Sequence, residues 1–251
     1  MDSGFSGAFR TLTRFSVPGK EGGKQNRTLF WFPFVGLVLG LFASLLALLP
    51  FSPLLRASLI VAFHAYATRG FHLDGLCDMA DGFGGGWDKE QTLRIMRDSH
   101  VGSFAIIALS CTLLVQVSAL SEVVSYVPVV VFAPMVGRFM QVLVISFSSY
   151  AREGKGTASA LVTESGPRHC IAPFLFLAVF LIVLYVRDSA LFLPCMFAFI
   201  AALSMALFLM RLSKKRLQGV TGDVLGAVEV LCETSAYIGA LLILAIETLA
   251  R

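Results

Sequence analysis

The fold of this chain is predicted from one stretch, Phe71-His-Leu-Asp74-Gly-Leu-Cys-Asp78-Met-Ala-Asp81-Gly-Phe-Gly-Gly-Gly86. If a single helix runs through it, a rotation of about 100° per residue places Asp74, Asp78 and Asp81 within an arc of roughly 60°. Carboxylates so close together repel one another, and a divalent cation removes that repulsion. Oxygen ligands suit Mg²⁺, Mn²⁺ or Ca²⁺. The stretch therefore predicts a metal site on one face of a helix.

The other interpretation of these acids is the solvated face of a surface helix. Such a face usually mixes basic residues among the acids, and this segment contains no base between Arg69 and Lys89. An EF-hand loop starting at Asp74 is excluded, because Met79 and Gly85 stand where that loop needs Gly and Glu. A phosphate-binding loop is excluded as well, since neither Gly-Lys-Ser nor Gly-Lys-Thr follows the glycines. The metal interpretation is therefore favoured.

The segment after the three aspartates contains glycines and one further acid. Gly82 and the glycines at 84–86 are predicted to end the helix and to let a bulky ligand approach the backbone. Residues 87–97 then favour a short helix, and a hairpin here would return Asp98 to the three aspartates as a fourth metal ligand. The alternative is that Asp98 or Ser99 caps the helix of the next apolar segment and has no other role.

The composition is that of a membrane protein. Of the 251 residues, 57% are hydrophobic and 14% are charged, and a spanning helix needs about 20 mostly apolar residues. None of the apolar segments alternates in polarity as a membrane β-barrel strand does. We therefore predict an all-α fold, a polytopic membrane helical bundle in a single domain of residues 1–251. Its seven candidate spans are 29–49, 53–69, 102–121, 127–147, 170–186, 190–210 and 224–249.

The cysteines and the first residues give no sign of covalent processing. The five cysteines are scattered and form no Cys-x-x-Cys pair, so free thiols are predicted rather than zinc ligands or disulfides. The first apolar run begins only near Leu29, and no small-residue cleavage site follows it before Pro50. We therefore expect the first span to remain in the mature chain.

The basic residues are distributed unequally between the two sides of the predicted spans. With seven spans and a cytoplasmic N-terminus, all but four of the 20 Lys and Arg residues lie on the cytoplasmic side. The exceptions are Arg138 within a span, and Arg56, Arg187 and Arg251 on the opposite side. The positive-inside rule then predicts a multi-pass protein of the cell (inner) membrane whose acidic stretch faces the cytoplasm. The net charge of +4 is explained by this sidedness, so no nucleic-acid partner is expected, and a homo-oligomer is compatible with the pattern.

Residues 1–28 form a cytoplasmic N-terminal segment in this topology. Between residues 5 and 16, Phe5, Phe9 and Leu12 share one helical side, whereas Arg10 and Arg14 lie on another. The pattern predicts a short interfacial helix in the headgroup region of the membrane, with a flexible basic tail as the alternative. Residues 20–27 form a polar loop by composition.

Several ionisable residues lie within predicted spans, where lipid-facing side chains should be apolar. Glu229 and Glu233 share a helix face, and Asp223 lies near the inner mouth of the same helix. Together with Arg138 they are candidate functional residues. The alternative is that Arg138 pairs with one of the two glutamates and only joins two helices. For His64 we expect a hydrogen-bonded packing residue.

Two loops on the predicted cytoplasmic side carry bases. The loop at residues 150–157 places Arg152 and Lys155 among glycines, which favours the approach of a substrate's phosphate groups. The loop at residues 211–216 contains four bases, for which contact with membrane lipid headgroups is a strong alternative explanation. We therefore predict a phosphorylated substrate whose charge is shared between these cations and a metal.

These residues together resemble a known family. His72-Leu-Asp-Gly-Leu-Cys-Asp-Met-Ala-Asp-Gly82 and Ile95-Met-Arg-Asp-Ser-His-Val-Gly-Ser-Phe104 are similar to motifs of cobalamin-5′-phosphate synthase, also called adenosylcobinamide-GDP ribazoletransferase. Further similarity lies at residues 31–36, 150–156, 219–226, 229 and 233, so the resemblance covers nearly the whole chain. Arg69 and Gln218 stand where the family usually has glycine, and Arg97 and His100 replace a more usual Lys and Arg.

The resemblance implies a reaction and its participants. The alcohol of α-ribazole, or of its 5′-phosphate, displaces GMP from adenosylcobinamide-GDP, with Mg²⁺ required, and forms adenosylcobalamin or its 5′-phosphate. Mg²⁺ held by the acids would neutralise the pyrophosphate, and a carboxylate free of metal would accept the hydroxyl proton. The metal candidates are Asp74, Asp78, Asp81 and Asp98, and the candidate catalytic bases are Asp81 and Asp98. The candidate substrate-binding residues are His72, Arg97, Arg138, Arg152, Lys155, Asp223, Glu229 and Glu233.

Two other functions remain open at this point. Asp78-x-x-Asp81-Gly82 also resembles part of the core motif of CDP-alcohol phosphotransferases, although no Ala-Arg follows Gly82 at the spacing of that motif. A proton-coupled transporter would use Arg138, Glu229 and Glu233 as an ion path. The chain shows no internal repeat, and its acids concentrate on one side of the membrane, which favours the transferase.

Overall fold

The structure, a computed structural model, describes residues 3–15, 17–18, 25–152 and 158–249. In these residues the only extended pairing is an isolated parallel bridge between Tyr150 and Val220. All other elements are helices, in the order α1 Ser3–Leu12, η1 Gln25–Trp31, α2 Phe32–Ala47, α3 Pro53–Ala67, α4 Phe71–Gly85, α5 Lys89–Ile95, α6 Ser103–Val123, α7 Val127–Phe147, α8 Ser159–Thr163, η2 Pro167–Cys170, α9 Ile171–Arg187, η3 Ser189–Leu191, α10 Phe192–Leu217 and α11 Gly222–Leu249.

Six helical segments of the described chain are long and apolar enough to cross a membrane, namely Gln25–Ala47, Ser103–Val123, Val127–Phe147, Pro167–Arg187, Ser189–Leu217 and Gly222–Leu249. The predicted multi-pass helical bundle is thereby confirmed. The remaining predicted span, at residues 53–69, forms the shorter helix α3 of 15 residues. At 1.5 Å per residue this is roughly 22 Å, less than the ~30 Å of a hydrocarbon core.

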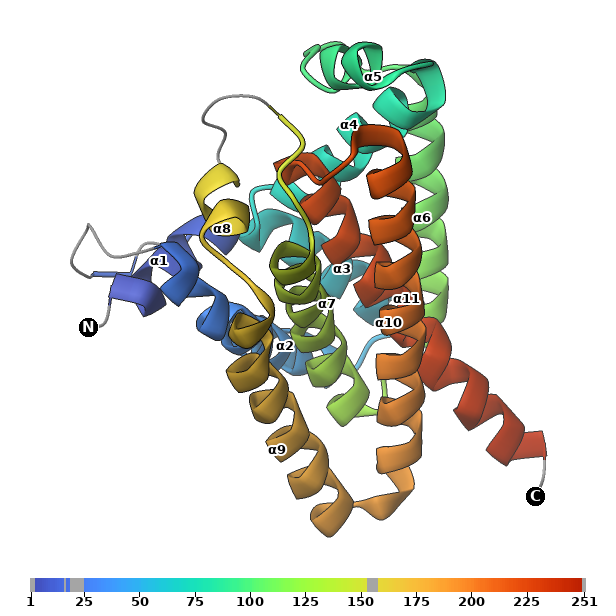
Figure 1. Ribbon diagram of the computed structural model, residues 1–251. Coiled ribbons are helices and arrows are strands. Elements are labelled where there is room, and N and C mark those ends of the chain that lie inside the picture. The colour runs from blue at the N-terminus through green and yellow to red at the C-terminus, as the bar shows by residue number, and fades with distance from the viewer. Residues whose placement is uncertain (1–2, 16, 19–24, 153–157, 250–251) are drawn as a thin grey trace.

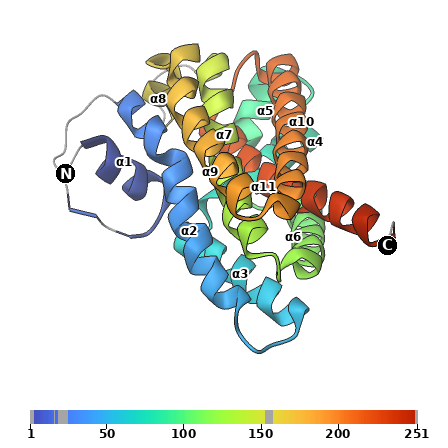
Figure 2. The same ribbon diagram turned by 90° about the horizontal axis from the view of Figure 1, so that it is seen from below.

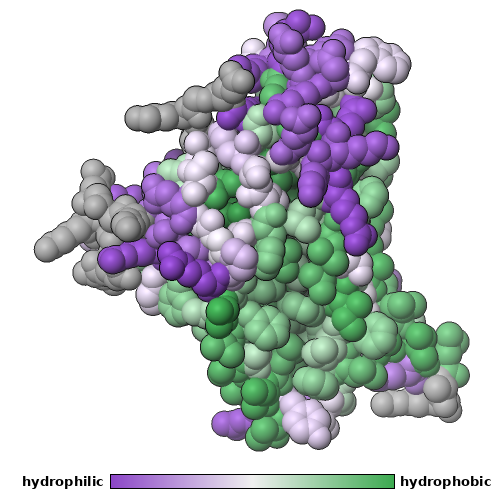
Figure 3. Space-filling view, in the orientation of Figure 1, coloured by the Kyte–Doolittle hydropathy of each residue, from purple (hydrophilic) through white to green (hydrophobic). Residues whose placement is uncertain are grey.

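The surface of the bundle is divided between a polar end and an apolar body. In Figure 1 the long helices α6, α7, α9 and α10 run roughly upright, with α6 in the upper part, α9 in the lower part and α10 extending through both. Figure 3 shows hydrophilic residues gathered at the upper end and beside α1 and α8, and hydrophobic residues over the lower half. The helices α4 and α5 belong to this polar end (Figure 1). We call it the polar end below.

The centre of the bundle is α7, of which 94% of the spanning window is buried. Its neighbours include α2, α10 and α11. Gly36 and Gly40 lie four residues apart on α2, and a Cβ on them would collide with the α7 backbone at Pro134 and Val131. These small residues therefore allow the two backbones to pack closely, as small residues do between helices in lipid.

The acidic stretch forms the single helix that its spacing predicts. The helix α4 follows a turn in which Arg69 and Gly70 both have positive φ, and it ends at Gly85. The predicted helix stop is therefore confirmed, but the expected approach of a ligand to these glycines is wrong. A Cβ on Gly82 would meet Met96 and Thr92, the latter a residue of α5, and one on Gly84 would meet Phe104 of α6. Protein side chains already occupy this space.

The N-terminal segment is a helix that packs against the protein. Phe9 and Leu12 of α1 are buried, and the ring of Phe5 lies 5.1 Å from that of Trp31. The predicted helix is confirmed, the flexible tail is wrong for these residues, and the helix ends at Leu12 rather than at residue 16. Its apolar side contacts protein instead of facing only lipid. Figure 2 shows α1 at one side of the bundle and the end of α11 at the other. Most of the predicted polar loop, at residues 20–24, lies outside the described residues.

Candidate active site at the polar end

The aspartates of α4 meet a fourth carboxylate from the start of α11. Burial raises the pKa of Asp78 to about 6, and the negative charges of Asp223 and Asp74 are the next largest causes. A Cβ on Gly75 would lie 2.7 Å from the carbonyl oxygen of Asp223, so the two helices touch here. Asp74, Asp78 and Asp223 are called the acidic group below.

Two loops that are far apart in the sequence hold Asp223 in place. A nitrogen of Arg152 lies 2.6 Å from Asp223 Oδ2, and the hydroxyl of Thr221 lies 3.2 Å from the same oxygen. The backbone N–H of Ala151 donates to the carbonyl of Val220 at 2.9 Å, next to the bridge between residues 150 and 220. Arg152 therefore lies beside the acidic group, as a phosphate-binding residue would need to. Lys155, predicted for the same role, lies outside the described residues.

Asp81 faces another partner although it lies on the same helix. Its two carboxylate oxygens accept hydrogen bonds from the backbone N–H groups of Gly102 at 2.7 Å and Ala105 at 2.9 Å. It thus satisfies the unpaired donors at the start of α6, where the N-terminal residue Gly102 has no side chain to do so. The alternative prediction that Asp98 or Ser99 caps this helix is therefore wrong.

Asp98 pairs with a neighbour in its own loop. Its Oδ1 lies 2.6 Å from the ring nitrogen Nδ1 of His100 and accepts the backbone N–H of that residue at 3.0 Å. These contacts lower the pKa of Asp98, and none of the other aspartates contributes to the shift. Asp98 lies four residues before Gly102 in the same loop. Since Gly102 contacts Asp81, this loop does pass close to Asp81. The expected return of Asp98 into one group with Asp74 and Asp78 is not what the structure shows.

The acidic group fits a divalent cation only in part. Among the described residues, no set of three or more His, Cys, Asp or Glu side chains lies close enough to hold a metal ion. Asp81 and Asp98 are turned toward α6 and toward His100, which explains why the four predicted ligands do not converge. Burial raises the pKa of Asp78 most, and the nearby charges of Asp223 and Asp74 add to it; this mutual repulsion is the condition that a cation relieves. Of the described residues, Asp74, Asp78 and Asp223 come nearest to such a site, although their side chains do not stand close enough together here to surround an ion.

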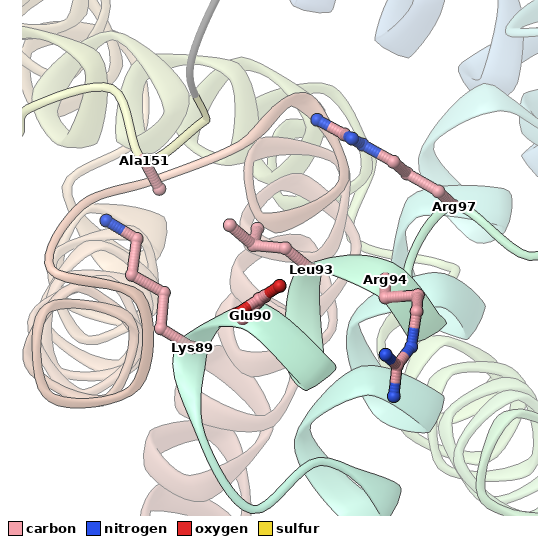
Figure 4. Close-up of a pocket in the computed structure, with 6 residues that line it drawn as sticks. All are labelled: Lys89, Glu90, Leu93, Arg94, Arg97 and Ala151. Carbon is pink, nitrogen blue, oxygen red and sulfur yellow. The ribbon is translucent and has the colours of Figure 1, made fainter.

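A cleft of about 640 Å³ opens beside α5 and the loop of Ala151. Its lining includes Lys89, Leu93, Arg97 and Ala151 (Figure 4), and we call it the basic cleft. Figure 4 shows the amino group of Lys89 directed toward Ala151, while Arg97 extends from the far end of α5 and Arg94 points away. The volume is in the range typical of ligand-binding pockets.

A second polar cluster lies inside the bundle. Arg138, 1% exposed, lies 2.7 Å from Glu229 Oε1 and 3.5 Å from Glu233 Oε2, so the predicted pairing with the last span is confirmed. His72 Nδ1 lies 3.1 Å from Glu229 Oε2, and His64 Nδ1 lies 3.0 Å from Glu233 Oε1. His64 is thus buried and hydrogen-bonded, as expected. The cluster joins α3, α4, α7 and α11.

Three contributors to these two sites were missed by sequence reasoning. Gln116 and Tyr237 both contact Glu233 Oε1, at 3.5 and 3.2 Å. A polar Gln in the middle of a predicted span was the signal that could have found the first. Arg216 donates from one nitrogen to the carbonyls of Phe83 at 2.8 Å and Gly86 at 2.6 Å, at the C-terminal end of α4. Its position in a basic run gave no hint of that contact.

The chain is similar to proteins of one named family. A family model described as cobalamin-5-phosphate synthase matches residues 4–241. The chain is 40% identical to the adenosylcobinamide-GDP ribazoletransferase of Prosthecochloris aestuarii, over 97% of this chain and 99% of that protein. It is 42% identical to the protein of the same name from Chlorobium phaeobacteroides, over 88% of this chain and 90% of that one. No solved structure matches the chain with statistical significance.

Proposed function

Because the chain belongs to the cobalamin-5-phosphate synthase family, we propose that it joins α-ribazole, or its 5′-phosphate, to adenosylcobinamide-GDP and releases GMP. The observation that carries the proposal at this site is the contact of α4 with the start of α11 at Gly75, which brings Asp223 beside the aspartates of α4 at the polar end. A reaction between two phosphorylated substrates needs this kind of charged site. The similar proteins carry the transferase name, so a lipid phosphotransferase or a transporter is not favoured.

The reaction exchanges one phosphorus–oxygen bond for another. A ribose hydroxyl oxygen of the acceptor attacks the phosphorus that bears the corrinoid arm. The bond from that phosphorus to the bridging oxygen breaks, and GMP leaves with the electron pair. The hydroxyl proton passes to a carboxylate. The product is adenosylcobalamin, or its 5′-phosphate when the acceptor is phosphorylated.

The contacts of the residues at the polar end suggest a different role in this reaction for each of them. Asp74, Asp78 and Asp223 would hold a Mg²⁺ ion, which when bound neutralises charge on the pyrophosphate and on departing GMP. Arg152 already neutralises Asp223 at 2.6 Å and lies where a substrate phosphate would meet a bidentate guanidinium. Both oxygens of Asp81 are occupied by α6 and Oδ1 of Asp98 is occupied by His100, so the role of either residue as proton acceptor stays a prediction.

The buried cluster supports a different role from substrate contact. Arg138, Glu229 and His72 are each at least 95% buried and paired with one another inside the bundle. This burial supports the proposal that they hold α4 against α11 and α7 and so position the acidic group. The predicted contacts of these residues and of Glu233 with substrate stay predictions.

The membrane setting completes the proposal. We place the protein in the cell inner membrane with the polar end in the cytoplasm, since nearly all its basic residues lie on that side of the predicted spans. Substrates linked to nucleotides would then reach the site from the cytoplasm. The N-terminal helix α1 would lie on the same side.

The proposal is tested by measuring GMP release from purified protein given adenosylcobinamide-GDP, α-ribazole 5′-phosphate and Mg²⁺. Asp78→Asn is expected to abolish turnover, because it removes one charge of the acidic group without changing side-chain volume. The matched control is Asp188→Asn, an exposed carboxylate between α9 and α10, and it should retain activity. Chelation of Mg²⁺ should stop the wild type and its return should restore it. Full activity of Asp78→Asn at saturating Mg²⁺ would contradict the assignment of Asp78 as a metal ligand.

A further inference from the structure

The basic cleft contains cations that the proposed chemistry leaves unused. Lys89, Arg94 and Arg97 contribute three positive charges to its lining and Glu90 one negative charge. In the described part of the chain, none of these three bases forms an ion pair with an acid. Arg138, Arg152 and Arg216, by contrast, all have partners in the protein. The cleft is therefore a place where unpaired positive charge lines a cavity large enough for a ligand.

The cleft lies beside the reaction centre. Ala151 forms part of its lining and is followed directly by Arg152, whose guanidinium contacts Asp223. The backbone bond from Ala151 to Val220 fixes this junction at 2.9 Å. At the other end, Arg97 precedes Asp98 in the chain. A ligand seated in the cleft would therefore contact the chain one residue before Arg152, the base that touches the acidic group, while its other end remains among the bases.

The two charged parts of the reaction need different counter-charges. The pyrophosphate lies where the bond changes, so it belongs beside the carboxylates and the cation they would hold. The 5′-phosphate of the acceptor takes no part in the bond change but sits on the same ribose as the attacking hydroxyl. It therefore needs a fixed positive charge one sugar away from the reaction centre. Lys89 and Arg97 line such a space at its two ends, with Leu93 between them (Figure 4).

From this arrangement we propose that the basic cleft binds the phosphate monoester of the acceptor, through Lys89 and Arg97, and so selects α-ribazole 5′-phosphate over free α-ribazole. The inference rests on the proposed ribazole transfer. A charge-assisted hydrogen bond to a phosphate typically contributes enough to change binding by roughly 10- to 100-fold. The cleft would thus set acceptor preference without touching the bond that breaks.

The test is steady-state kinetics with both acceptors at saturating adenosylcobinamide-GDP and Mg²⁺. In Lys89→Ala we expect the KM for α-ribazole 5′-phosphate to rise roughly 10- to 100-fold, while the KM for free α-ribazole and the kcat for either acceptor stay within about twofold. Arg97→Ala should shift the same preference, and Lys89→Arg should keep it. The control is Lys215→Ala, an exposed lysine of the same end that does not line the cleft.

A binding measurement makes the test independent of turnover. Without the corrinoid substrate, α-ribazole 5′-phosphate should raise the melting temperature of the wild type and of Lys215→Ala but not of Lys89→Ala. Equal losses for both acceptors in a folded Lys89→Ala would overturn the inference, as would a rise in the KM for adenosylcobinamide-GDP alone, which would assign the cleft to the nucleotide. Absence of GMP release by the wild type with either acceptor would instead refute the transferase itself.

Discussion

The carboxyl group of Asp78 is half-buried and lies near Asp223 and Asp74, and all three conditions disfavour its charged form. Its pKa in the folded protein, about 6, is above the ordinary value of 3.8. Between these two values the folded chain keeps a proton that the unfolded chain has lost. Without metal, this residue therefore makes the protein less stable as the pH rises from about 4 to 6.

Removing this charge should therefore stabilise the protein while destroying its activity. At pH 7.5 and without Mg²⁺ we expect Asp78→Asn to melt higher than the wild type by a few degrees. After discounting for solvent screening at this half-exposed site, that shift corresponds to about 1 kcal/mol. The difference should shrink toward pH 4, and added Mg²⁺ should raise the wild type more than the variant. Melting curves in detergent across this pH range measure the effect, and a lower melting point for the variant at pH 7.5 would contradict it.

Two residues adopt a backbone conformation that suits glycine better. Arg69 and Gln218 have φ values of 58° and 60°, and they are the two positions at which the resembled family usually has glycine. A left-handed non-glycine residue costs roughly 1–2 kcal/mol, part of which is offset because glycine leaves the unfolded chain freer. The two positions at which this sequence departs from the glycine of the resembled family are thus positions of local backbone strain.

Arg69→Gly and Gln218→Gly should consequently each stabilise the protein by about 0.5–1 kcal/mol. For a chain of this size each would raise the melting temperature by roughly 1–4 °C. Arg69→Ala is the matched control, because it removes the same side chain but keeps the strained Cβ, and it should give no such gain. A variant with Gly at position 69 that melts no higher than the Ala variant would show that the turn is not strained.

At the residue scale, the sequence predicted what depends on spacing within one helix. The shared helix of Asp74, Asp78 and Asp81 follows from the rotation per residue alone. The partners of Asp81 and Asp98 could not be predicted in this way, because they depend on where α6 begins and on how its loop turns. Asp223 was predicted as a substrate-binding residue, but its place among the α4 acids needed the contact at Gly75.

Among the elements, α4 is held at its C-terminal end by a residue of another helix. Its glycine-rich C-terminal turn has low helix propensity and leaves carbonyl groups without helical partners. Arg216 of α10 donates to two of these carbonyls, at 2.8 and 2.6 Å, and its guanidinium lies 5.8 Å from the ring centroid of Phe83. The positive charge also complements the negative end of the helix dipole. The element that carries the acids is thus held by a base from a distant segment.

We therefore expect Arg216→Ala to loosen the end of α4. Amide hydrogen exchange at residues 82–86 should become faster, and stability should fall by about 1–2 kcal/mol. Arg216→Lys should restore part of the protection, since an ammonium group can still donate to a carbonyl. The control is Lys215→Ala, the exposed neighbour on the same helix. Unchanged exchange at these residues in Arg216→Ala would show that the glycines alone define this end.

The buried cluster acts at the same scale by joining helices through charge. One arginine, two glutamates and two histidines from four helices meet inside the bundle. Removal of one member of such a group, or its displacement, leaves an uncompensated buried charge. The group therefore fixes the relative positions of the helices that carry its members. The sequence predicted the pairing of Arg138, because ionisable residues in a span must find partners. It did not predict His72 there, since that residue belongs to α4, outside the spans.

For the whole molecule, the apolar pattern predicted the spans closely, for example 127–147 for α7 at Val127–Phe147. It predicted less well what happens at α3, whose length falls short of a full span. The structure nevertheless shows that the end of α3 returns to the N-terminal segment. The backbone N–H of Arg14 donates to the carbonyl of Ala67 at 2.7 Å, and the guanidinium lies 3.8 Å from the ring centroid of Tyr66. The N-terminal segment therefore lies at the end of α3 that leads into α4.

This contact makes the sidedness of the molecule a single testable question. If α2 and α3 together bring the chain back to its starting side, then α1, α4 and α5 share one side of the membrane, and the basic residues predict that this side is the cytoplasm. Trp87, 90% exposed at the turn between α4 and α5, reports on this side. Ser189, exposed between α9 and α10, lies in the connection at the opposite end in Figure 1.

In a background without the native cysteines, Trp87→Cys should react with a membrane-impermeant maleimide only in inverted membrane vesicles. Ser189→Cys should react only in intact spheroplasts, which makes each variant the control for the other. The expected loop near residue 155 should behave as Trp87→Cys does. Reaction of Trp87→Cys from outside intact spheroplasts would reverse the topology. The GDP-linked substrate would then have to reach the acidic group from the side on which nucleotides are scarce, and the proposed reaction would lose its supply.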